Sequence, residues 1–137
     1  MKHLLAIILF AIMLAKAGTA EIWVVAPQNY KSESIKLKDL RRLYMGYIQY
    51  HEDRRVTLTQ IEGQPLSEFV DKFLKINVNA YQQKWYGMIF TGKGELPRTF
   101  KKDAELVAFI KTSENAIGFI SSQESVIEGV KILTVLE

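Results

Sequence analysis

Short apolar runs alternate with amphipathic helical patterns along this chain, and that alternation limits the folds open to it. Four runs rich in apolar and β-branched residues have the length of buried strands. They cover 22–26, 56–61, 116–120 and 130–135. Apolar residues recur at helical spacing in the stretches between and around them, at 37–46, 65–74, 79–90 and 103–112. Apolar strands separated by helices predict a three-layer α/β/α sandwich around a largely parallel or mixed sheet.

The helix beginning at Pro65 has the clearest start signal. Proline is favoured in the first helical turn, and Gly63 lies in the turn just before it. We expect Asp103 to cap the last helix, and the apolar faces of all four helices to pack on the sheet. The predicted core residues include Leu40, Leu43, Phe69, Phe73, Trp85, Ile89, Ile110 and Ile117.

Residues 1–20 have the pattern of a signal peptide. Lys2 and His3 precede an unbroken apolar run from Leu4 to Ala15, and small residues follow up to Ala20. The run is too short for a stable membrane-spanning helix, which needs about 20 residues. We therefore expect cleavage after Ala20, with cleavage after Ala17 as an alternative, and a periplasmic domain of residues 21–137. An uncleaved membrane anchor is the other interpretation, whereas a lipid anchor is excluded because the chain has no cysteine.

The charge balance argues against a nucleic-acid-binding protein. The chain has 18 basic and 15 acidic residues and a net charge of +3. Lys2 and Lys16 belong to the leader, so the predicted domain carries only +1, and its basic residues are not gathered in one stripe. Without cysteines, an exported domain of this size must be held by a single hydrophobic core.

No catalytic constellation is evident. His51 is the single histidine after the leader, and it lies in a charged stretch that we interpret as a solvated loop, not a metal site. There is no cysteine nucleophile, and no serine has the surroundings of a nucleophile elbow. These features predict a protein that is not an enzyme and that carries no cofactor or metal.

The turn between the strand at 56–61 and the helix beginning at Pro65 is the best candidate binding site. Free backbone N–H groups and the helix dipole suit an oxyanion at such a position. Gly63 allows a ligand to approach the backbone, and the Gln64 and Ser67 side chains add donors. The alternative is that this is an ordinary connection, since every α/β domain contains such turns.

Several segments, read in order, resemble a known family. The stretch 37–46, LKDLRRLYMG, is similar to an L-x-x-L-R-x-I-F-x-G helix. A second set of motifs follows the order found in short relatives of the same family. The set consists of Trp85, the run 90–94 (FTGKG), Pro97 and the run 116–119 (AIGF). This family is the periplasmic phosphate-binding proteins of ABC transporters, which have the type II periplasmic binding protein fold. The resemblance implies a single lobe of that fold, with phosphate or another small oxyanion as ligand.

Two departures from the family limit what the resemblance implies. Full binding proteins close two lobes around a solute, and this chain has the length of one. Gln64, Pro65 and Leu66 stand where the family has Ser-Gly-Thr, and Thr59 and Gln60 stand where the family has an Arg. We therefore expect weak, non-enzymatic binding, with an ABC permease, a sensor kinase or a dimer mate supplying a second lobe as possible partners. The alternative function is a ligand-free periplasmic interaction module that partners a sensor kinase or an envelope complex.

Overall fold

The computed structural model describes residues 21–121 and 127–137. The predicted signal peptide, residues 1–20, lies outside this part of the chain, so its cleavage stays a prediction. None of the helices described is long and apolar enough to cross a membrane.

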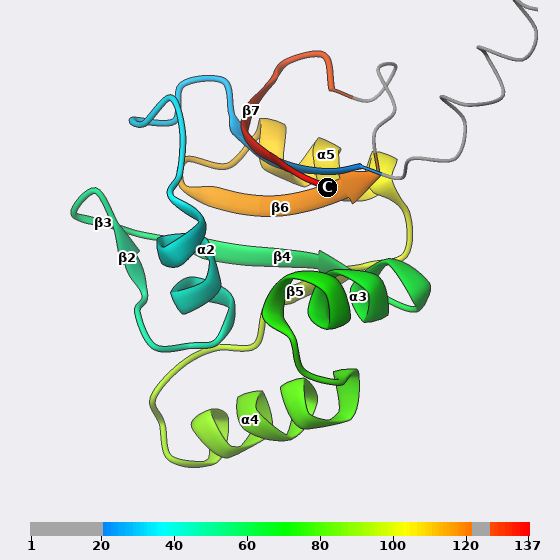
Figure 1. Ribbon diagram of the computed structural model, residues 1–137. Coiled ribbons are helices and arrows are strands. Elements are labelled where there is room, and N and C mark those ends of the chain that lie inside the picture. Colours follow the sequence, from blue (N-terminus) through cyan, green and yellow to red (C-terminus); the bar gives the residue numbers. More distant parts are fainter. Residues whose placement is uncertain (1–20, 122–126) are drawn as a thin grey trace, which may run out of the picture.

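A five-stranded mixed sheet forms the centre of the molecule (Figure 1). Its strands are β1 (Ile22–Pro27), β4 (Thr57–Ile61), β5 (Arg98–Phe100), β6 (Ala116–Ser121) and β7 (Val130–Leu136), in the order β5-β4-β6-β1-β7. β4 is parallel to β5 and β6, whereas β1 is antiparallel to β6 and β7. All four strands predicted from the apolar runs are confirmed, and β5 adds a short edge strand after Pro97.

Helices cover both faces of the sheet, which gives the predicted three layers. The helices are α2 (Leu37–Tyr44), α3 (Gln64–Phe69), the π-helical turn η1 (Val70–Leu74), α4 (Val78–Phe90) and α5 (Asp103–Lys111). α5 lies on one side of the sheet and α2 and α3 on the other (Figure 1). Alternate residues of each strand supply the two cores: Val24 faces the α2 side with Ile117, and Val25 faces the α5 side with Ile120.

An aromatic cluster fills the core on the α2 side. The Phe69 ring stacks on that of Phe119 with centroids 4.0 Å apart, and the Tyr44 ring meets Phe69 edge-on at 4.8 Å. The Tyr44 hydroxyl donates to the Thr59 carbonyl at 2.8 Å, so its polar atom is satisfied within the core. Seven of the predicted core residues are buried: Leu40, Leu43, Phe69, Phe73, Trp85, Ile110 and Ile117.

The core on the α5 side depends on a close approach between helix and sheet. Gly118 of β6 lies beneath Leu106, and a Cβ atom at position 118 would come within 2.8 Å of the Leu106 Cδ2 atom. The predicted cap of α5 is wrong, because Asp103 is the first helical residue and its side chain makes no capping bond. Its carboxylate instead accepts the Ser121 N–H at 3.3 Å, which ties the start of α5 to the end of β6.

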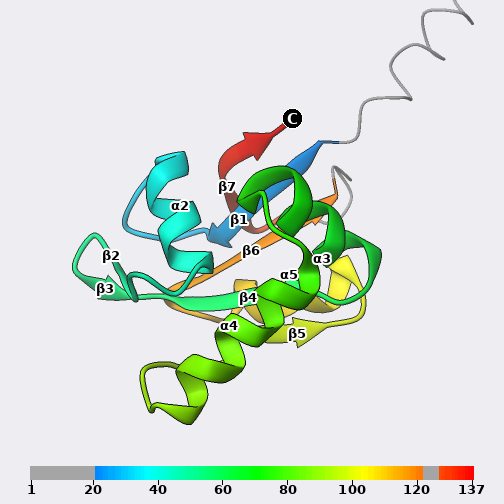
Figure 2. The same ribbon diagram turned by 60° about the horizontal axis from the view of Figure 1, so that its bottom comes forward.

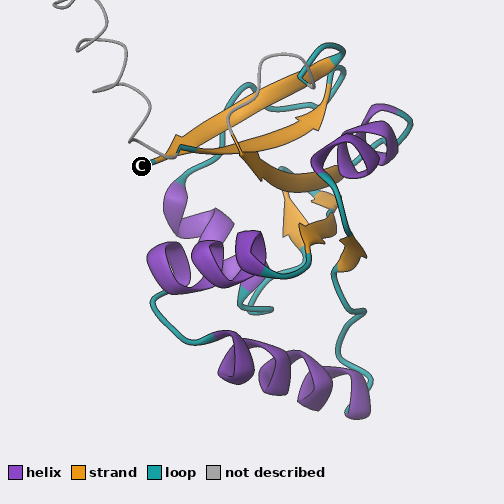
Figure 3. Cartoon of the chain, turned by 90° about the vertical axis from the view of Figure 1, so that its right-hand side faces the viewer, coloured by secondary structure: helices purple, strands orange, loops and turns teal. Residues whose placement is uncertain are grey.

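Helix α4 forms a separate row outside the sandwich (Figure 3). Tyr81 and Trp85 are buried, and Val78 and Met88 are partly buried against the core. The predicted burial of Ile89 is wrong, since its side chain is 38% exposed. Ile89 is rotated by about 100° from Met88 around the helix, and only the stripe through Met88 faces the body.

The stretch around His51 is also not the predicted solvated loop. Strands β2 (Tyr50–His51) and β3 (Arg54–Arg55) form a small hairpin, and Glu52 and Asp53 make its turn with positive φ. This hairpin turns His51 inward, where it is buried and lies with its Nδ1 2.7 Å from the Tyr30 hydroxyl. Burial, with a smaller contribution from the charge of Glu52, raises the pKa of Tyr30 to about 12.

Candidate functional site

The ends of β4 and β5 lie together at one edge of the sheet. Ile61 of β4 is opposite Phe100 of β5, and the Glu62 N–H donates to the Phe100 carbonyl at 2.9 Å. The turn that follows β4 is therefore fixed beside the Lys101-Lys102 pair that follows β5. Ligands of open α/β sheets bind at this kind of edge, outside the carboxyl ends of parallel strands.

The turn from β4 leads into a helix that begins within one residue of the predicted start at Pro65. Gly63 adopts a φ of 82°, a left-handed conformation that favours glycine, and α3 begins at the next residue. The Ser67 N–H donates to the Gly63 carbonyl at 3.1 Å, and Pro65 has no N–H. By helix geometry, the N–H groups of Gln64 and Leu66 are left without an intrahelical acceptor.

A pocket of about 340 Å³ opens beside this turn, between α3, α4 and β5. Gly63 and Ser67 line one side of it. The other lining residues are mostly apolar or aromatic: Leu66, Val78, Trp85, Tyr86, Leu96 and Pro97. The pocket thus combines two of the residues predicted for an anion site, Gly63 and Ser67, with a largely apolar wall.

A chain of hydrogen bonds lines the same pocket. The Tyr81 hydroxyl donates to the Gln60 side-chain oxygen at 2.8 Å, and the Gln60 amide donates to the Thr99 hydroxyl at 3.1 Å. Burial raises the pKa of Tyr81 above its usual range, so the phenol stays protonated and remains a donor at neutral pH. Sequence reasoning missed Gln60 and Thr99, because an isolated polar residue in a strand gives no signal that distinguishes a pocket from solvent.

The charge of the pocket does not favour tight anion binding. Glu62 is the only charged residue among its lining side chains, within the described residues. Lys101 and Lys102 are exposed at the neighbouring strand end but do not line the pocket. The geometry therefore provides neutral donors and no charge-assisted contact of the kind that makes phosphate binding strong.

The three site residues predicted from the sequence do not all meet. Gly63 and Ser67 line the pocket, as just described, but Gln64 does not. The Gln64 amide instead donates to the Glu68 carboxylate at 3.1 Å, one helical turn away. An i,i+4 pair of this kind is a common surface interaction of helices, and it holds the Gln64 side chain along α3.

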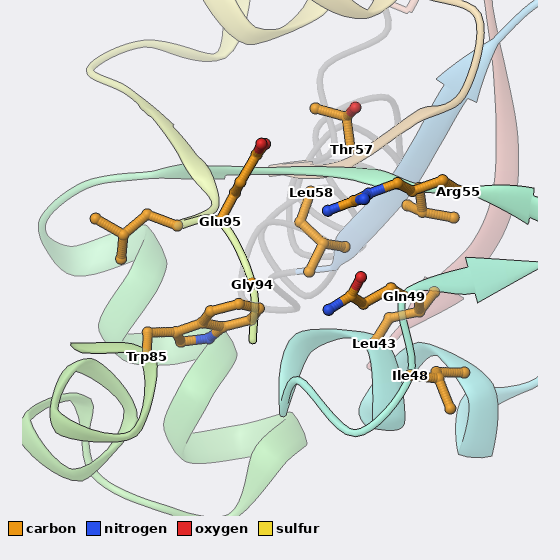
Figure 4. Close-up of a pocket in the computed structure, with 11 residues that line it drawn as sticks. Leu43, Ile48, Gln49, Arg55, Thr57, Leu58, Trp85, Gly94 and Glu95 are labelled. Atoms are coloured by element: carbon orange, nitrogen blue, oxygen red, sulfur yellow. The ribbon is translucent and has the colours of Figure 1, made fainter. Parts of the chain in front are cut away.

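A second, smaller pocket lies between the loop after α2 and the start of β4 (Figure 4). Its volume of about 70 Å³ leaves room for little more than water. Gln49 and Arg55 reach into it, and the Trp85 ring forms the opposite wall (Figure 4). Within residues 21–121 and 127–137, no three potential metal-ligating side chains come together around this or any other point.

Comparison with solved structures identifies what this arrangement resembles. The chain is similar to a phosphate ABC transporter substrate-binding protein with bound phosphate from Clostridium perfringens, with a TM-score of 0.62 and 14% identity. It is also similar to PstS from Borrelia burgdorferi (TM-score 0.62, 15% identity) and to an ABC-type phosphate transport receptor from Vibrio cholerae (TM-score 0.55, 14% identity). Its fold is that of one lobe of these proteins.

The match covers most of this chain and less than half of each relative. The shared part is 84% of this chain but 45% of the Clostridium protein, 47% of the Borrelia protein and 46% of the Vibrio protein. No protein-family model matches the sequence, and no curated protein matches it either. At this level of identity the likeness concerns the fold, and it confirms the α/β fold class and the single-lobe resemblance expected from the sequence.

Proposed function

We propose that this chain is an exported, non-catalytic protein that binds phosphate or another small oxyanion weakly. The observation that carries the proposal is the fold, which is shared with one lobe of a phosphate ABC transporter substrate-binding protein with bound phosphate, of a phosphate transport receptor and of PstS. Export rests on the leader pattern of residues 1–20, and the expected mature chain begins near Glu21. The Clostridium neighbour is a substrate-binding protein with bound phosphate and the Vibrio neighbour is a transport receptor, which supports a binding role.

The proposed anion position is the turn between β4 and α3. The N–H groups of Gln64 and Leu66 and the Ser67 hydroxyl are the donors, and the helical stretch that begins there contributes its dipole. Gln64 thus takes part through its backbone, while its side chain pairs with Glu68. Lys101 and Lys102 add a favourable potential from the neighbouring strand end.

The affinity of the chain alone should be low. Helix dipoles contribute about 0.3–1 kcal/mol each to binding an anion, whereas micromolar affinity needs about 8 kcal/mol. The carboxylate of Glu62 at the pocket opposes an anion. We therefore expect a dissociation constant near 1 mM, which corresponds to about 4 kcal/mol. Tighter binding would require a second lobe, from a dimer mate or from another protein such as a permease or sensor kinase.

An NMR titration tests the proposal directly. Residues 21–137 labelled with ¹⁵N are titrated with phosphate and with sulfate, and with chloride at matched ionic strength. We expect phosphate-specific shifts at residues 62–67 that saturate in the millimolar range. Shifts clustered elsewhere would show that the position is wrong, and equal shifts with chloride would overturn the proposed function.

Two variants and one control sharpen the titration. Ser67→Ala removes a proposed donor and should weaken binding, whereas Glu62→Gln removes the opposing charge and should strengthen it. Ser34→Ala is the control, because Ser34 is equally exposed but lies outside the pocket. If Glu62→Gln leaves phosphate binding unchanged, the ligand does not lie beside this turn.

A further inference from the structure

The pocket between α3, α4 and β5 has more walls than the oxyanion position beside Gly63 uses. Its volume of about 340 Å³ falls within the range of about 300–1,000 Å³ that small-molecule sites have. The turn before α3 forms one wall, and α4 and residues 96–99 form most of the others. Figure 2 shows α3, β5 and the first turns of α4 around this part of the molecule. These other walls are available to a ligand of their own.

The wall formed by α4 and residues 96–99 offers apolar surface. Tyr86 and Leu96 line the pocket and are 49% and 51% exposed. Trp85 and Pro97, their neighbours in the chain, also line the pocket but are buried. A ligand that covers Tyr86 and Leu96 removes apolar surface from water, which favours binding. The ligand that fits this wall therefore has an apolar face.

The hydrogen-bond chain that starts at Tyr81 ends in a donor. The Gln60 side-chain oxygen accepts from Tyr81, and the Gln60 amide donates to the Thr99 hydroxyl. The Thr99 hydroxyl therefore has its own proton left to donate. Among the described residues, its acceptor is the Pro97 carbonyl at 3.4 Å, which is long for an O–H···O bond. A ligand oxygen beside Thr99 can accept this proton at a shorter distance.

The remaining polar side chains of the pocket require a ligand that also donates. Glu62 is exposed, lines the pocket and makes no ion pair with another described residue. Its carboxylate only accepts hydrogen bonds, whereas the side chains of Ser67 and Gln82 both donate and accept. A ligand that contacts both Thr99 and Glu62 has to accept from the first and donate to the second. Hydroxyl groups do both.

The charges around the pocket favour an uncharged ligand. Glu62 is the only charged residue among the described lining side chains, so an anion inside the pocket meets repulsion and no cation. A single exposed carboxylate also contributes little to binding a cation. Two charged residues close to the lining segment have other surroundings. The Arg98 guanidinium lies 4.6 Å from the centre of the Phe109 ring, and Glu95 lines the smaller pocket of Figure 4.

We propose that this pocket binds an uncharged sugar. A sugar ring has C–H groups on its faces and hydroxyls around its rim, so one molecule carries both the apolar face and the hydroxyls that the pocket requires. The ring packs against Tyr86 and Leu96, one hydroxyl oxygen accepts from Thr99, and another hydroxyl donates to Glu62. Sugar binding does not depend on the proposed oxyanion binding, because its contacts do not include the N–H groups of residues 64–66.

An NMR titration with sugars tests the proposal. Residues 21–137 contain every described helix and strand and both cores, so this stretch is labelled with ¹⁵N and used without the leader. The ligands are D-glucose, D-galactose, D-mannose and D-ribose, with D-glucuronate as the anionic comparison. We expect at least one uncharged sugar to shift the amides of residues 81–86 and 96–99, and D-glucuronate to bind more weakly. No shift there with any of the four sugars, or D-glucuronate binding at least as tightly as the best of them, would overturn the proposal.

Two variants, each with a matched control, test the proposed contacts. Tyr86→Ala should weaken sugar binding by about fivefold or more, because the ring loses the apolar surface on which it packs. Tyr50→Ala removes a tyrosine of similar exposure, 57%, outside the pocket and should bind like the original chain. Thr99→Val removes the donor at nearly constant shape and should weaken binding by about threefold to tenfold. Thr57→Val is its control, because Thr57 is an exposed threonine of β4 that does not line this pocket.

The variants must keep the dispersed amide spectrum of the original chain. If Tyr86→Ala and Thr99→Val both bind the sugar as the original chain does, the sugar does not lie in this pocket and the proposal fails. It also fails if the two controls weaken binding as much as the two pocket variants do.

Glu62→Gln separates sugar binding from the proposed oxyanion function. The change should strengthen phosphate binding, because it removes a repelling charge, and should weaken sugar binding, because a charged acceptor is lost. Sugar shifts without phosphate-specific shifts would uphold sugar binding and overturn the oxyanion function. Phosphate-specific shifts without sugar shifts would do the reverse. Stronger sugar binding by Glu62→Gln would contradict the proposed contact between a sugar hydroxyl and this carboxylate.

Discussion

Phe69 ends α3 and Phe90 ends α4, and the fold buries the first and exposes the second. Phe69 is fully buried and stacks on Phe119 at 4.0 Å, within the aromatic core under α2 and α3. Phe90 ends α4 and is 93% exposed. The aromatic residues of the sandwich body therefore pack in its core. Helix α4 contacts the body through one narrow row of side chains and leaves other apolar side chains exposed to solvent. The aromatic residues that stabilise the fold and the apolar residues left exposed therefore belong to different parts of the chain.

The largest effect should come from removing an aromatic ring of the body. Phe69→Ala should lower the free energy of unfolding by about 3–5 kcal/mol, because the cavity lies in a fully buried cluster. Phe90→Ala, the matched change in α4, should alter it by less than about 0.5 kcal/mol. Urea denaturation of both variants measures the difference. Similar losses in both would show that Phe90 is packed in solution.

A smaller effect is expected where α5 approaches the sheet. Gly118→Ala should destabilise the fold by about 1–3 kcal/mol, because the added methyl group has no room. It would meet Leu106 and the Thr59 hydroxyl, and that hydroxyl is held in place by its 2.9 Å bond to the Ile117 carbonyl. Thermal unfolding followed by circular dichroism tests this. An unchanged melting temperature would mean that α5 does not approach β6 as closely as the structure shows.

The attachment of α4 depends on a polar contact that can be removed alone. Tyr81→Phe deletes the hydroxyl that donates to Gln60. This change should lower the free energy of unfolding by about 1 kcal/mol. Water in the adjoining pocket can replace part of the lost bond, which keeps the cost small. Hydrogen exchange should accelerate in α4 and remain slow in β1 and β6. Tyr86→Phe, at an exposed position of the same helix, is the control. It should change neither the free energy of unfolding nor the rate of hydrogen exchange in α4.

The smallest predicted effect has the opposite sign. Gly87 lies inside α4, and a Cβ atom there would meet no other atom within 4 Å. Gly87→Ala should stabilise the protein by about 0.5–1 kcal/mol, since alanine loses less backbone entropy in a helix. Differential scanning calorimetry of Gly87→Ala and Gly118→Ala compares the melting temperatures of the two variants with that of the original chain. Destabilisation by Gly87→Ala would indicate that this face of α4 is covered in solution.

Hydrophobic periodicity predicted the elements of the body because each apolar face there finds a partner. The runs at 22–27 and 116–120 are apolar throughout and lie between two helical layers, so length and composition were sufficient. The same reasoning failed at Ile89. Periodicity shows which residues share one side of a helix. The width of the helix face that becomes buried depends on the elements that pack against it.

The candidate site was predictable at the level of the backbone only. Proline near the start of a helix and a glycine before it define the turn in the sequence, and in the structure Gly63 directly precedes α3 with a φ of 82°. The direction of the Gln64 side chain could not be predicted, because Glu68 competes for it one turn later. Gln60 and Thr99 meet only through the parallel pairing of β4 and β5, a contact between distant segments.

The position of β1 has a consequence for how the chain acquires its structure. Ile22 at the start of this strand pairs with Ser121 on one side and with Leu136 on the other. β1, the first strand of the sheet in chain order, therefore gains neither neighbour until β6 and β7, the last two strands, have formed. Such long loop closures make folding slow, in the range of about milliseconds to seconds. The five-stranded sheet can therefore be completed only after the segments that form β6 and β7 have been synthesised.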